Sequence, residues 1–411
     1  MSDVVEEIVY ARCCGLDVHK AEIVACTIIN GKKEVKTFST MTDELLSMAK
    51  WLKDKEIQMT AMESTGSYWK PVFNILEIEE IPAILVNAQH IKTLRGRKTD
   101  VKDAEWIASL LRHGLLTASF VPQREMRELR ELVKYRSSLT EDSTRTLNRI
   151  EKILQGANIK LSNVISKTGT KTELSIIAAL ANGVSDTEKL SKLAQGSLKN
   201  KVAELERALN GLIGDHQRLL LKSMYNHLKQ IEEEIAVIEA EIDKRMEKDA
   251  SIIECLDSIP GVGKTTAQSI LAEIGTNMDQ FPSEKNLASW AGVCPGQNES
   301  AGKRKSGKTR KGNSHLKKTL VQCANSASHT KDTYLSAQFK RILSRRGRKR
   351  ALVALAHTIL IICYVLIKEN VKYQELGADF FDKRNKADIV KRSIKRLEAL
   401  GYEVTVKHKV A

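Results

Sequence analysis

The chain has 411 residues, 42% of them hydrophobic, which is enough for two or three domains with cores of their own. Its formal net charge of +15 favours a polyanionic partner. The seven cysteines show no C-x-x-C spacing, which argues against a zinc ribbon or a disulfide framework and fits a reducing cytosol. The first residues, MSDVVEEIVY, lack the apolar segment of a secretory signal, so we expect a cytoplasmic protein.

Residues 8–120 are predicted to form an α/β region. Three segments of strand length come in succession, and helical and strand segments then alternate. This order predicts a mixed sheet with helices packed on it. In chain order the segments are the strands CCGLDVHK, EIVACTII and VKTFST, the helix DELLSMAKWLK, the strand IQMTAME, the helix YWKPVFNILEI and the strand IPAILV.

The next stretch, RKTDVKDAEWIASLL, predicts a helix with two acids on one face. Asp100 and Asp103 are three residues apart, and their face continues into apolar residues that should be buried. Carboxylates on the buried face of a helix need a cationic partner, because an unpaired buried charge is costly. The buried residues of this face are predicted to be Ile107, Leu110 and Leu111. The basic stretch HIKTLRGRK just before the helix would attract phosphate through Arg95, Arg97 and Lys98.

Two further acids lie in predicted strands, Asp17 in GLDVHK and Glu63 in AMESTGSY. If these strands are neighbours, the four carboxylates converge in a ribonuclease-H-like arrangement that would hold Mg²⁺ for phosphodiester chemistry. Each acid alone has a plainer explanation: Asp17 could cap, Glu63 could pair with a lysine, and the two helix acids could favour the helix dipole. The metal site is preferred because these explanations would all have to coincide.

Residues 123–250 are predicted to be almost wholly helical. Apolar residues recur at alternating spacings of three and four, as in an a/d seam over three heptads. The seam could pack within one chain as an antiparallel hairpin, or between subunits as a coiled coil, and the sequence leaves both open. The seam residues are Leu221, Met224, Leu228, Ile231, Ile235, Ile238 and Ile242.

The segment SIPGVGKTTAQSILAEIG, residues 258–275, has a tight turn followed by an apolar-periodic helix. It is similar to a helix-hairpin-helix element, in which the amides of Gly261 and Gly263, beside Lys264, would contact a backbone phosphate without reading sequence. The spacing does not fit a Walker A loop. The alternative is a plain helix–turn–helix connection.

Residues 290–318 are rich in Gly, Ser and basic residues and show little periodicity. By itself this composition predicts a disordered phosphate-binding tether. No Ser-His-Asp order is present, but a serine among cations could act on phosphate, since the cations would favour the alkoxide. The cations of this loop that we expect to contact nucleic acid are Lys303, Arg304, Lys305, Lys308, Arg310 and Lys311.

The apolar segment ALVALAHTILIICYVLI, residues 351–367, follows the basic run RRGRKR and is near the lower length limit of a membrane span. His357 and Thr358 interrupt its middle, and no second such segment exists. We therefore expect a buried core helix and no membrane partner.

Several of these stretches together resemble the transposases of the insertion-sequence-110 family, also called DEDD transposases or bridge-RNA-guided recombinases. They occur in the expected order over nearly the whole chain, and as an ordered set they are highly specific. The matching stretches are GLDVHK, MESTGSYWKPV, RKTDVKDAEWIASLL, LDSIPGVGKTTAQSILAEIG, LASWAGVCPGQNESAGKRKSGKTRKGN and the closing LGADFF and LEALGYEV.

The resemblance implies three domains: a RuvC-like α/β domain over 1–122, a helical coiled-coil region over 123–250, and a mainly α transposase domain with a nucleophilic serine over 251–411. It makes Asp17, Glu63, Asp100 and Asp103 the metal-binding tetrad. The family serine lies after the Trp-Ala-Gly-Val-x-Pro segment, near a Ser-Gly pair. Ser300 has the family's distance from Val-Cys-Pro but is followed by an alanine. Ser306 directly precedes a glycine and is the competitor.

The implied function is that of a prokaryotic site-specific DNA recombinase, associated with the nucleoid when bound. It would excise an element as a circle and reinsert it through a serine–DNA bond, which conserves the energy of the broken phosphodiester. A structured bridge RNA would pair with the double-stranded donor and target DNA while the protein contacts backbone. Alternatives are a Holliday-junction type nuclease, for which both serines are dispensable, and a non-catalytic architectural binder, which inward-facing acids disfavour.

The separation of the tetrad from the serine predicts a homo-oligomer, a dimer to tetramer. A rigid helix rises about 1.5 Å per residue, so the seam region would carry one domain away from the other. Exchange of two strands also needs two nucleophiles held in symmetry. We therefore expect a site shared between subunits; the alternative is a hairpin that closes the site within one chain.

Overall fold

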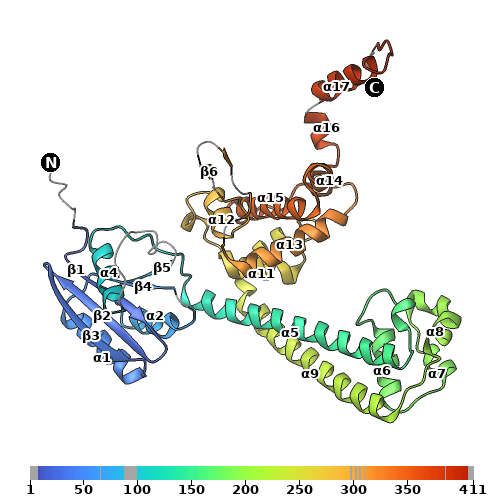
Figure 1. Ribbon diagram of the computed structural model, residues 1–411, viewed down its shortest axis with the longest axis horizontal. Helices are drawn as coiled ribbons and strands as arrows, with labels where there is room; N and C mark the ends of the chain where they lie inside the picture. The colour runs from blue at the N-terminus through green and yellow to red at the C-terminus, as the bar shows by residue number, and fades with distance from the viewer. Residues whose placement is uncertain are drawn as a thin grey trace. The chain divides into compact units, whose positions relative to one another are not determined.

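The structure, a computed structural model, divides into two compact units, Met1–Arg124 and Glu125–Ala411 (Figure 1). The predicted phosphate contacts of Arg95, Arg97 and Lys98 lie outside the described residues. The residues that the structure describes are 8–64, 66–87, 100–296, 299–300, 303–304, 307–309, 311–384 and 386–405.

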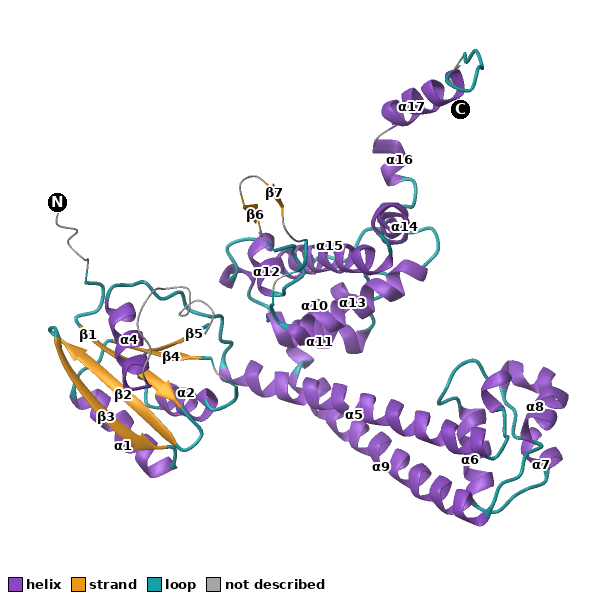
Figure 2. Ribbon diagram, viewed as in Figure 1, coloured by secondary structure: helices purple, strands orange, loops and turns teal. Residues whose placement is uncertain are grey.

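The first unit is built on a five-stranded sheet of order β3-β2-β1-β4-β5 (Figure 2). The first three strands are antiparallel neighbours, and β1, β4 and β5 are parallel to one another. Asn30 and Gly31, both at positive φ, make the tight turn between β2 and β3. The predicted mixed sheet is thus confirmed. Its strands are β1 (Arg12–Val18), β2 (Glu22–Ile29), β3 (Lys32–Ser39), β4 (Met59–Glu63) and β5 (Ala83–Val86).

Helices cover both faces of this sheet. On one face α1 (Thr42–Asp54) and α2 (Trp69–Ile78) bury a core that includes Leu16 and Met62. On the other face α4 (Asp100–Arg112) buries a second core with Cys13 and Ala61. Alternate residues of each strand therefore face different helices. The stripe predicted for α4 is confirmed, since its three apolar residues are at most 3% exposed: Ile107, Leu110 and Leu111.

Gly15 lets α4 lie directly on β1. A Cβ at this position would lie 2.3 Å from the carbonyl oxygen of Ala104 and 2.4 Å from the amide nitrogen of Ala108. Both of those helix residues are fully buried alanines, so the contact is backbone against backbone. Any side chain at position 15 must push the helix away from the sheet.

Gly15→Val is expected to destabilise the first unit by at least about 3 kcal/mol, at the upper end of overpacking costs, because helix backbone cannot yield as a side chain does. Thermal unfolding followed by circular dichroism measures the loss. The matched control is Gly263→Ala, where a Cβ would meet no atom within 4 Å. A Gly15→Val protein that melts like the control would contradict the close packing.

The second unit begins with a long helical hairpin of α5 (Arg124–Gly156) and α9 (Asp215–Arg245). Arg245 pairs with Glu128 at 3.1 Å, and the Tyr135 hydroxyl donates to Glu234, so the helices run antiparallel. Leu221, Leu228, Ile231 and Ile242 of the seam are buried, and Met224, Ile235 and Ile238 are partly exposed. The seam thus packs within the chain, as the hairpin alternative predicts. A coiled coil between subunits stays a prediction.

A small helical cap closes the end of the hairpin. Its core joins Ile150 and Leu154 of α5 to Leu221 of α9. The cap contains η1 (Leu161–Asn163), α6 (Lys171–Ala181), α7 (Thr187–Ser191), η2 (Gly196–Lys201) and α8 (Val202–Leu209).

The rest of the second unit is a helical assembly around α15 (Arg348–Glu369), which contacts α10, α12, α13 and α14. The surrounding elements are η3 (Glu247–Asp249), α10 (Ala250–Asp257), α11 (Lys264–Ile274), η4 (Met278–Gln280), α12 (Glu284–Trp290), β6 (Glu299–Ser300), β7 (Lys303–Arg304), α13 (Ser314–His329), α14 (Tyr334–Arg346), α16 (Phe380–Arg384) and α17 (Lys386–Glu398).

Helix α15 is long and apolar enough to cross a membrane by length and composition alone. In the structure half of its apolar window is buried against other helices. The amide of Gln338 on α14 donates to the Thr358 hydroxyl at 2.9 Å, so the polar residue in the middle of α15 has a partner inside the protein. These contacts support the core-helix interpretation.

Candidate active site

Asp17 and Glu63 lie side by side at the carboxyl ends of two parallel strands. Strands β1 and β4 pair with Leu16 opposite Met62, so the next pair in register is Asp17 and Glu63. Because side chains alternate along a strand, both acids are on the face of Gly15 and Ala61, which is the face that α4 covers. The two strands are therefore neighbours, which the predicted convergence of the carboxylates requires.

The start of α4 brings Asp103 to the same place. Ala104, the next residue, lies over Gly15, two positions before Asp17 on β1. Burial raises the pKa of Asp17, and the negative charges of Asp103 and Glu63 raise that pKa further. The three carboxylates are therefore close enough to interact electrically. Asp100 begins α4 one turn earlier, and its side chain lies outside the described residues.

His19 is a member of this cluster that sequence reasoning missed. Its Nε2 lies 3.1 Å from Oδ2 of Asp17, and the interaction with His19 lowers the pKa of Asp17, opposing the effect of burial. The His19 side chain is 52% exposed, whereas that of Asp17 is 17% exposed. The imidazole can therefore orient the carboxylate from the solvent side. The sequence feature that could have identified His19 is its position two residues after Asp17 in GLDVHK.

The donor set fits a divalent cation. Among the described side chains no preformed group of three His, Cys, Asp or Glu residues surrounds a metal position. The cluster nevertheless offers carboxylate oxygens, which hard cations such as Mg²⁺ prefer. Burial is the main reason that the pKa of Asp17 is raised, with smaller contributions from Asp103 and Glu63, and a bound cation would favour the ionised carboxylate.

The predicted serine lies in a short β-hairpin. Ser300 of β6 pairs with Lys303 of β7, and Glu299 pairs with Arg304. Further along, the Gly296 amide donates to the Lys308 carbonyl at 2.9 Å, and Pro295 bridges Thr309. The expectation of a tether without regular structure is wrong for these residues, because cross-strand backbone hydrogen bonds order them.

The structure locates only some of the other residues predicted to act in this hairpin. Lys308 and Lys311 are exposed, as a phosphate contact requires. Ser306, Lys305 and Arg310 lie outside the described residues, as do the side chains of Ser300, Lys303 and Arg304.

Asn313 fastens the end of the hairpin segment to two helices. Its side-chain amide donates to Glu273 Oε2 of α11 at 2.6 Å, and its backbone amide donates to the Trp290 carbonyl at the end of α12. Its side-chain oxygen also caps α13 by accepting from the Leu316 amide at 3.0 Å. The segment that carries the predicted serine is therefore anchored at Asn313 to α11 and α12.

Glu273, the partner of Asn313, belongs to a buried ionic cluster. The Glu273 side chain is 1% exposed and lies 3.5 Å from Arg130 and 3.3 Å from Lys134, both on α5. Arg130 also donates to the Ala272 carbonyl at 2.9 Å. Charged partners keep this buried carboxylate from being an unpaired charge. Sequence reasoning missed the cluster, although a single acid within the apolar run AQSILAEIG was a signal.

The three residues predicted to contact phosphate in the helix-hairpin-helix turn have different surroundings in the structure. Gly261 has a φ of +88°, and a Cβ there would lie 2.5 Å from the Ala327 amide nitrogen, so this glycine packs against α13. Gly263 is exposed at the N-terminus of α11. Lys264 pairs with Asp243 of α9 at 2.8 Å. Of the predicted phosphate contacts in this turn, Gly263 and Lys264 are both exposed, and Lys264 already has an acidic partner.

Comparison with known proteins gives two family matches. Residues 14–159 match a family model of DEDD type described as transposase, and residues 253–341 match one described as transposase IS116/IS110/IS902 family. A transposase for insertion sequence element IS1111A from Coxiella burnetii is 26% identical over 88% of this chain and 91% of that protein. A probable family 20 transposase from Pseudomonas aeruginosa is 24% identical over 77% of this chain and 86% of that protein.

Proposed function

This chain belongs to the IS116/IS110/IS902 family of transposases, enzymes that act on DNA, and we propose that it is a site-specific recombinase that excises and inserts a mobile element through a serine–DNA intermediate. The observation that carries the strand-cleavage part of the proposal is the convergence of Asp17, Glu63 and Asp103 where two parallel strands end beneath α4, and the serine intermediate rests on the resemblance to the family. The sheet order and helix cover are compatible with a RuvC-like domain. Such a cluster suits chemistry on phosphodiesters.

The tetrad residues would hold a divalent cation, which we propose to be Mg²⁺. When bound, this ion supplies Lewis-acid polarisation of a phosphoryl oxygen. Asp17, Glu63, Asp100 and Asp103 would supply the carboxylates that hold it, and His19 would keep Asp17 oriented through the 3.1 Å contact. Helix α4 and Gly15 fix the distance between the strand acids and the helix acids.

Ser300 would supply the nucleophile. Its hydroxyl oxygen forms a bond to phosphorus while the bond from phosphorus to the leaving deoxyribose oxygen breaks, and the serine proton ends on that leaving oxygen. Attack by another strand end reverses these changes and releases the serine, so no ATP is consumed. The basic residues of the hairpin, Lys303 and Arg304 among them, would offset the transition-state charge.

A second candidate is a Mg²⁺-dependent, structure-specific nuclease of the Holliday-junction type. It is favoured by the location of the described carboxylates, since Asp17, Glu63 and Asp103 all belong to the first unit and converge without any contribution from the serine hairpin. This enzyme would cut without forming a covalent bond to DNA.

We further propose that a bridge RNA selects donor and target DNA by base pairing. The net charge of +15 and the 5% aromatic content suit contacts to nucleic-acid backbone better than base stacking. The proposed domains remain 1–122, 123–250 and 251–411, and the working particle would be a cytoplasmic homo-oligomer on the nucleoid.

A recombination assay tests the proposed function. Protein purified natively with its copurifying RNA should convert donor and target plasmids into joined products in Mg²⁺, because cleavage energy is kept in the serine–DNA bond. Chelation by EDTA should stop the reaction, and prior ribonuclease treatment should remove target choice. Nicked or linear DNA without joined products and without a covalent adduct would support the nuclease instead.

A further inference from the structure

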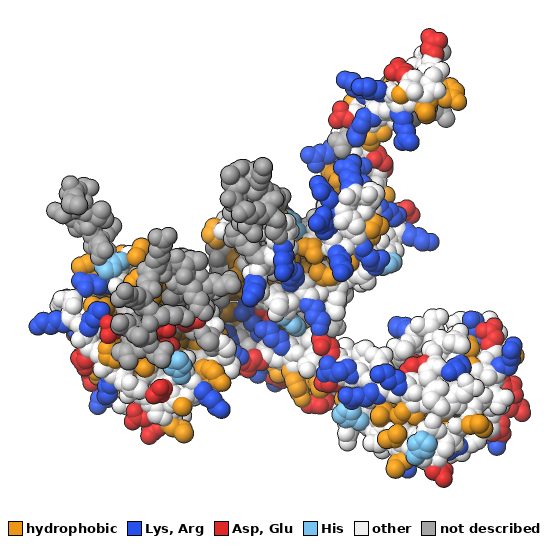
Figure 3. All heavy atoms as spheres, viewed as in Figure 1, with side chains coloured by type: hydrophobic (Ala, Val, Ile, Leu, Met, Phe, Trp, Pro, Cys, Tyr) orange, Lys and Arg blue, Asp and Glu red, His pale blue; other side chains and the backbone are white. Residues whose placement is uncertain are grey.

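The C-terminal helices α14, α16 and α17 line an open basic pocket outside the candidate active site. It has a volume of about 390 Å³, within the range of roughly 300–1,000 Å³ that is usual for ligand pockets. Lysine and arginine side chains gather on this part of the surface (Figure 3). The lining residues come from α14, α16 and α17: Arg341, Ser344, Arg345, Asp382, Ile389, Arg392, Ser393 and Arg396.

The arginines of this pocket form two matching pairs. Arg341 and Arg345 are four residues apart on α14, and Arg392 and Arg396 are four residues apart on α17. This spacing puts both members of a pair on one helix face, so two guanidinium pairs line the same space. Asp382 pairs with Arg341 at 3.3 Å and offsets one of the four charges. The repulsion among the others favours an anion between the helices.

Aromatic packing fixes α16 against α14 on one side of the pocket. The Tyr334 ring at the start of α14 stacks on Phe381 with centroids 5.1 Å apart and meets Phe380 edge-on at 5.2 Å. Arg341 lies over the Phe381 ring at 5.1 Å, so the same contact positions a pocket arginine. These contacts fix α16 against α14 and place Arg341 at the edge of the pocket.

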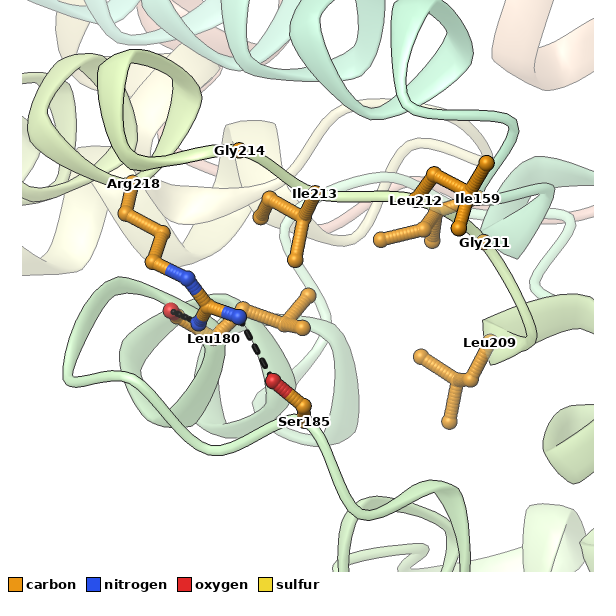
Figure 4. Close-up of a pocket in the computed structure, with 9 residues that line it drawn as sticks. All are labelled: Ile159, Leu180, Ser185, Leu209, Gly211, Leu212, Ile213, Gly214 and Arg218. Carbon is orange, nitrogen blue, oxygen red and sulfur yellow. Dashed lines mark hydrogen bonds between the residues drawn. The ribbon is translucent and has the colours of Figure 1, made fainter.

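The pocket at the hairpin cap is a useful contrast (Figure 4). Its arginine, Arg218, donates to the Leu180 carbonyl at 3.0 Å and to the Ser185 hydroxyl at 2.6 Å. Those bonds fasten α9 to α6 and its following loop. The other residues around it are mainly apolar, so that pocket offers no comparable anion site.

We propose that Arg341, Arg345, Arg392 and Arg396 form a clamp for the phosphodiester backbone of a duplex. Guanidinium groups bind phosphate oxygens in a bidentate fork, and Ser344 and Ser393 add hydroxyl donors. Among the described residues that line this pocket none is aromatic, so it offers no stacking surface for single-stranded bases. The inference rests on the proposed function, since it assigns this site to the nucleic acid of the same reaction.

The test is Arg392→Ala combined with Arg396→Ala, against the control Lys391→Ala with Lys395→Ala. The control removes the same charge at the same spacing from exposed positions of the same helix outside the pocket. Binding is measured over a salt series with a DNA duplex, an RNA duplex, a hybrid duplex and single strands. The arginine variant should bind duplex about ten-fold more weakly or worse, and the salt slope for DNA should fall by about 2, since each lost phosphate contact is worth ~0.9.

The type of nucleic acid whose binding weakens in the arginine variant identifies the ligand of the clamp. If both variants lose the same affinity for duplex, the effect is one of general surface charge and the clamp is wrong. If neither variant loses affinity, the clamp is wrong as well. If the arginine variant misfolds, Arg345→Ala tests the same pocket from α14. A wild-type protein that recombines DNA while the clamp variant binds like its control contradicts only this inference, whereas a wild-type protein without strand cleavage contradicts the proposed function.

Discussion

Asp103→Asn is expected to lower the rate of DNA strand cleavage by roughly 10²–10³-fold, as loss of a preorganised electrostatic group does. Asparagine keeps the size of the side chain but removes the negative charge, and Asp103 interacts electrically with Asp17 in the cluster at the end of β1. Nucleic-acid affinity should stay near that of the wild type, because the cluster does not attract the polyanion. Cleavage of labelled donor DNA and a binding titration measure the two effects.

The matched control is Glu105→Gln on the same helix. Glu105 pairs with Lys33 of β3 at 3.0 Å, a partly exposed ion pair of the kind that contributes little. Cleavage by this variant should be close to normal. Full activity in Asp103→Asn, or wild-type activity that persists in EDTA, would contradict the metal site.

Asp17→Asn should abolish cleavage in the same way without weakening the fold. Burial raises the pKa of Asp17 from its ordinary value of 3.8, so the folded protein binds this proton more tightly than the unfolded chain does. Stability therefore falls as the pH rises from that value through the raised pKa, and the cost is present at neutral pH. Asparagine removes the charge, so metal-free Asp17→Asn should melt no lower than wild type. If Asp17→Asn melts at a much lower temperature than the wild type, its loss of activity results from unfolding and not from loss of the carboxylate.

Ser300→Ala is expected to abolish both recombination and the covalent protein–DNA adduct. Alanine fits a β-hairpin position paired with Lys303 but has no oxygen to bond to phosphorus. The base of the segment is held independently by the bond from Asn313 to Glu273, so the substitution should leave the fold intact. Adducts are detected on denaturing gels with labelled DNA.

Ser306→Ala decides between the two candidate serines. It should retain the adduct if Ser300 is the nucleophile. Loss of the adduct in Ser306→Ala together with its persistence in Ser300→Ala would transfer the role to Ser306. Retention of recombination in both single variants and in the double variant would remove serine chemistry and leave the nuclease.

The same inactive variants test whether the site is shared between subunits. Mixed oligomers of Asp103→Asn and Ser300→Ala proteins contain composite sites with an intact tetrad from one chain and an intact serine from another. Partial recovery of recombination is expected, because exchange of two strands needs paired nucleophiles. No recovery in proven mixed oligomers would place the whole site within one chain.

The sequence by itself determined the elements and the acids of the first unit. Strand and helix periods, turn residues and the D-x-x-D spacing are local patterns, and the structure has the mixed sheet and the buried stripe of α4 that they predict. The sequence placed Asp17 and Glu63 in two strands, and the sheet order then showed that these strands are parallel neighbours. The family, too, was carried by short motifs in a fixed order.

Only the tertiary structure decided which distant residues support those elements. The contact of Gly15 with Ala104, the bond from Asn313 to Glu273 and the facing arginines of α14 and α17 each join segments well separated along the chain. It also gave Gly261 a packing role where a phosphate contact was predicted. Hydrophobic periodicity fixes which face of an element is buried, but the partner that covers that face is set by how whole helices and sheets pack.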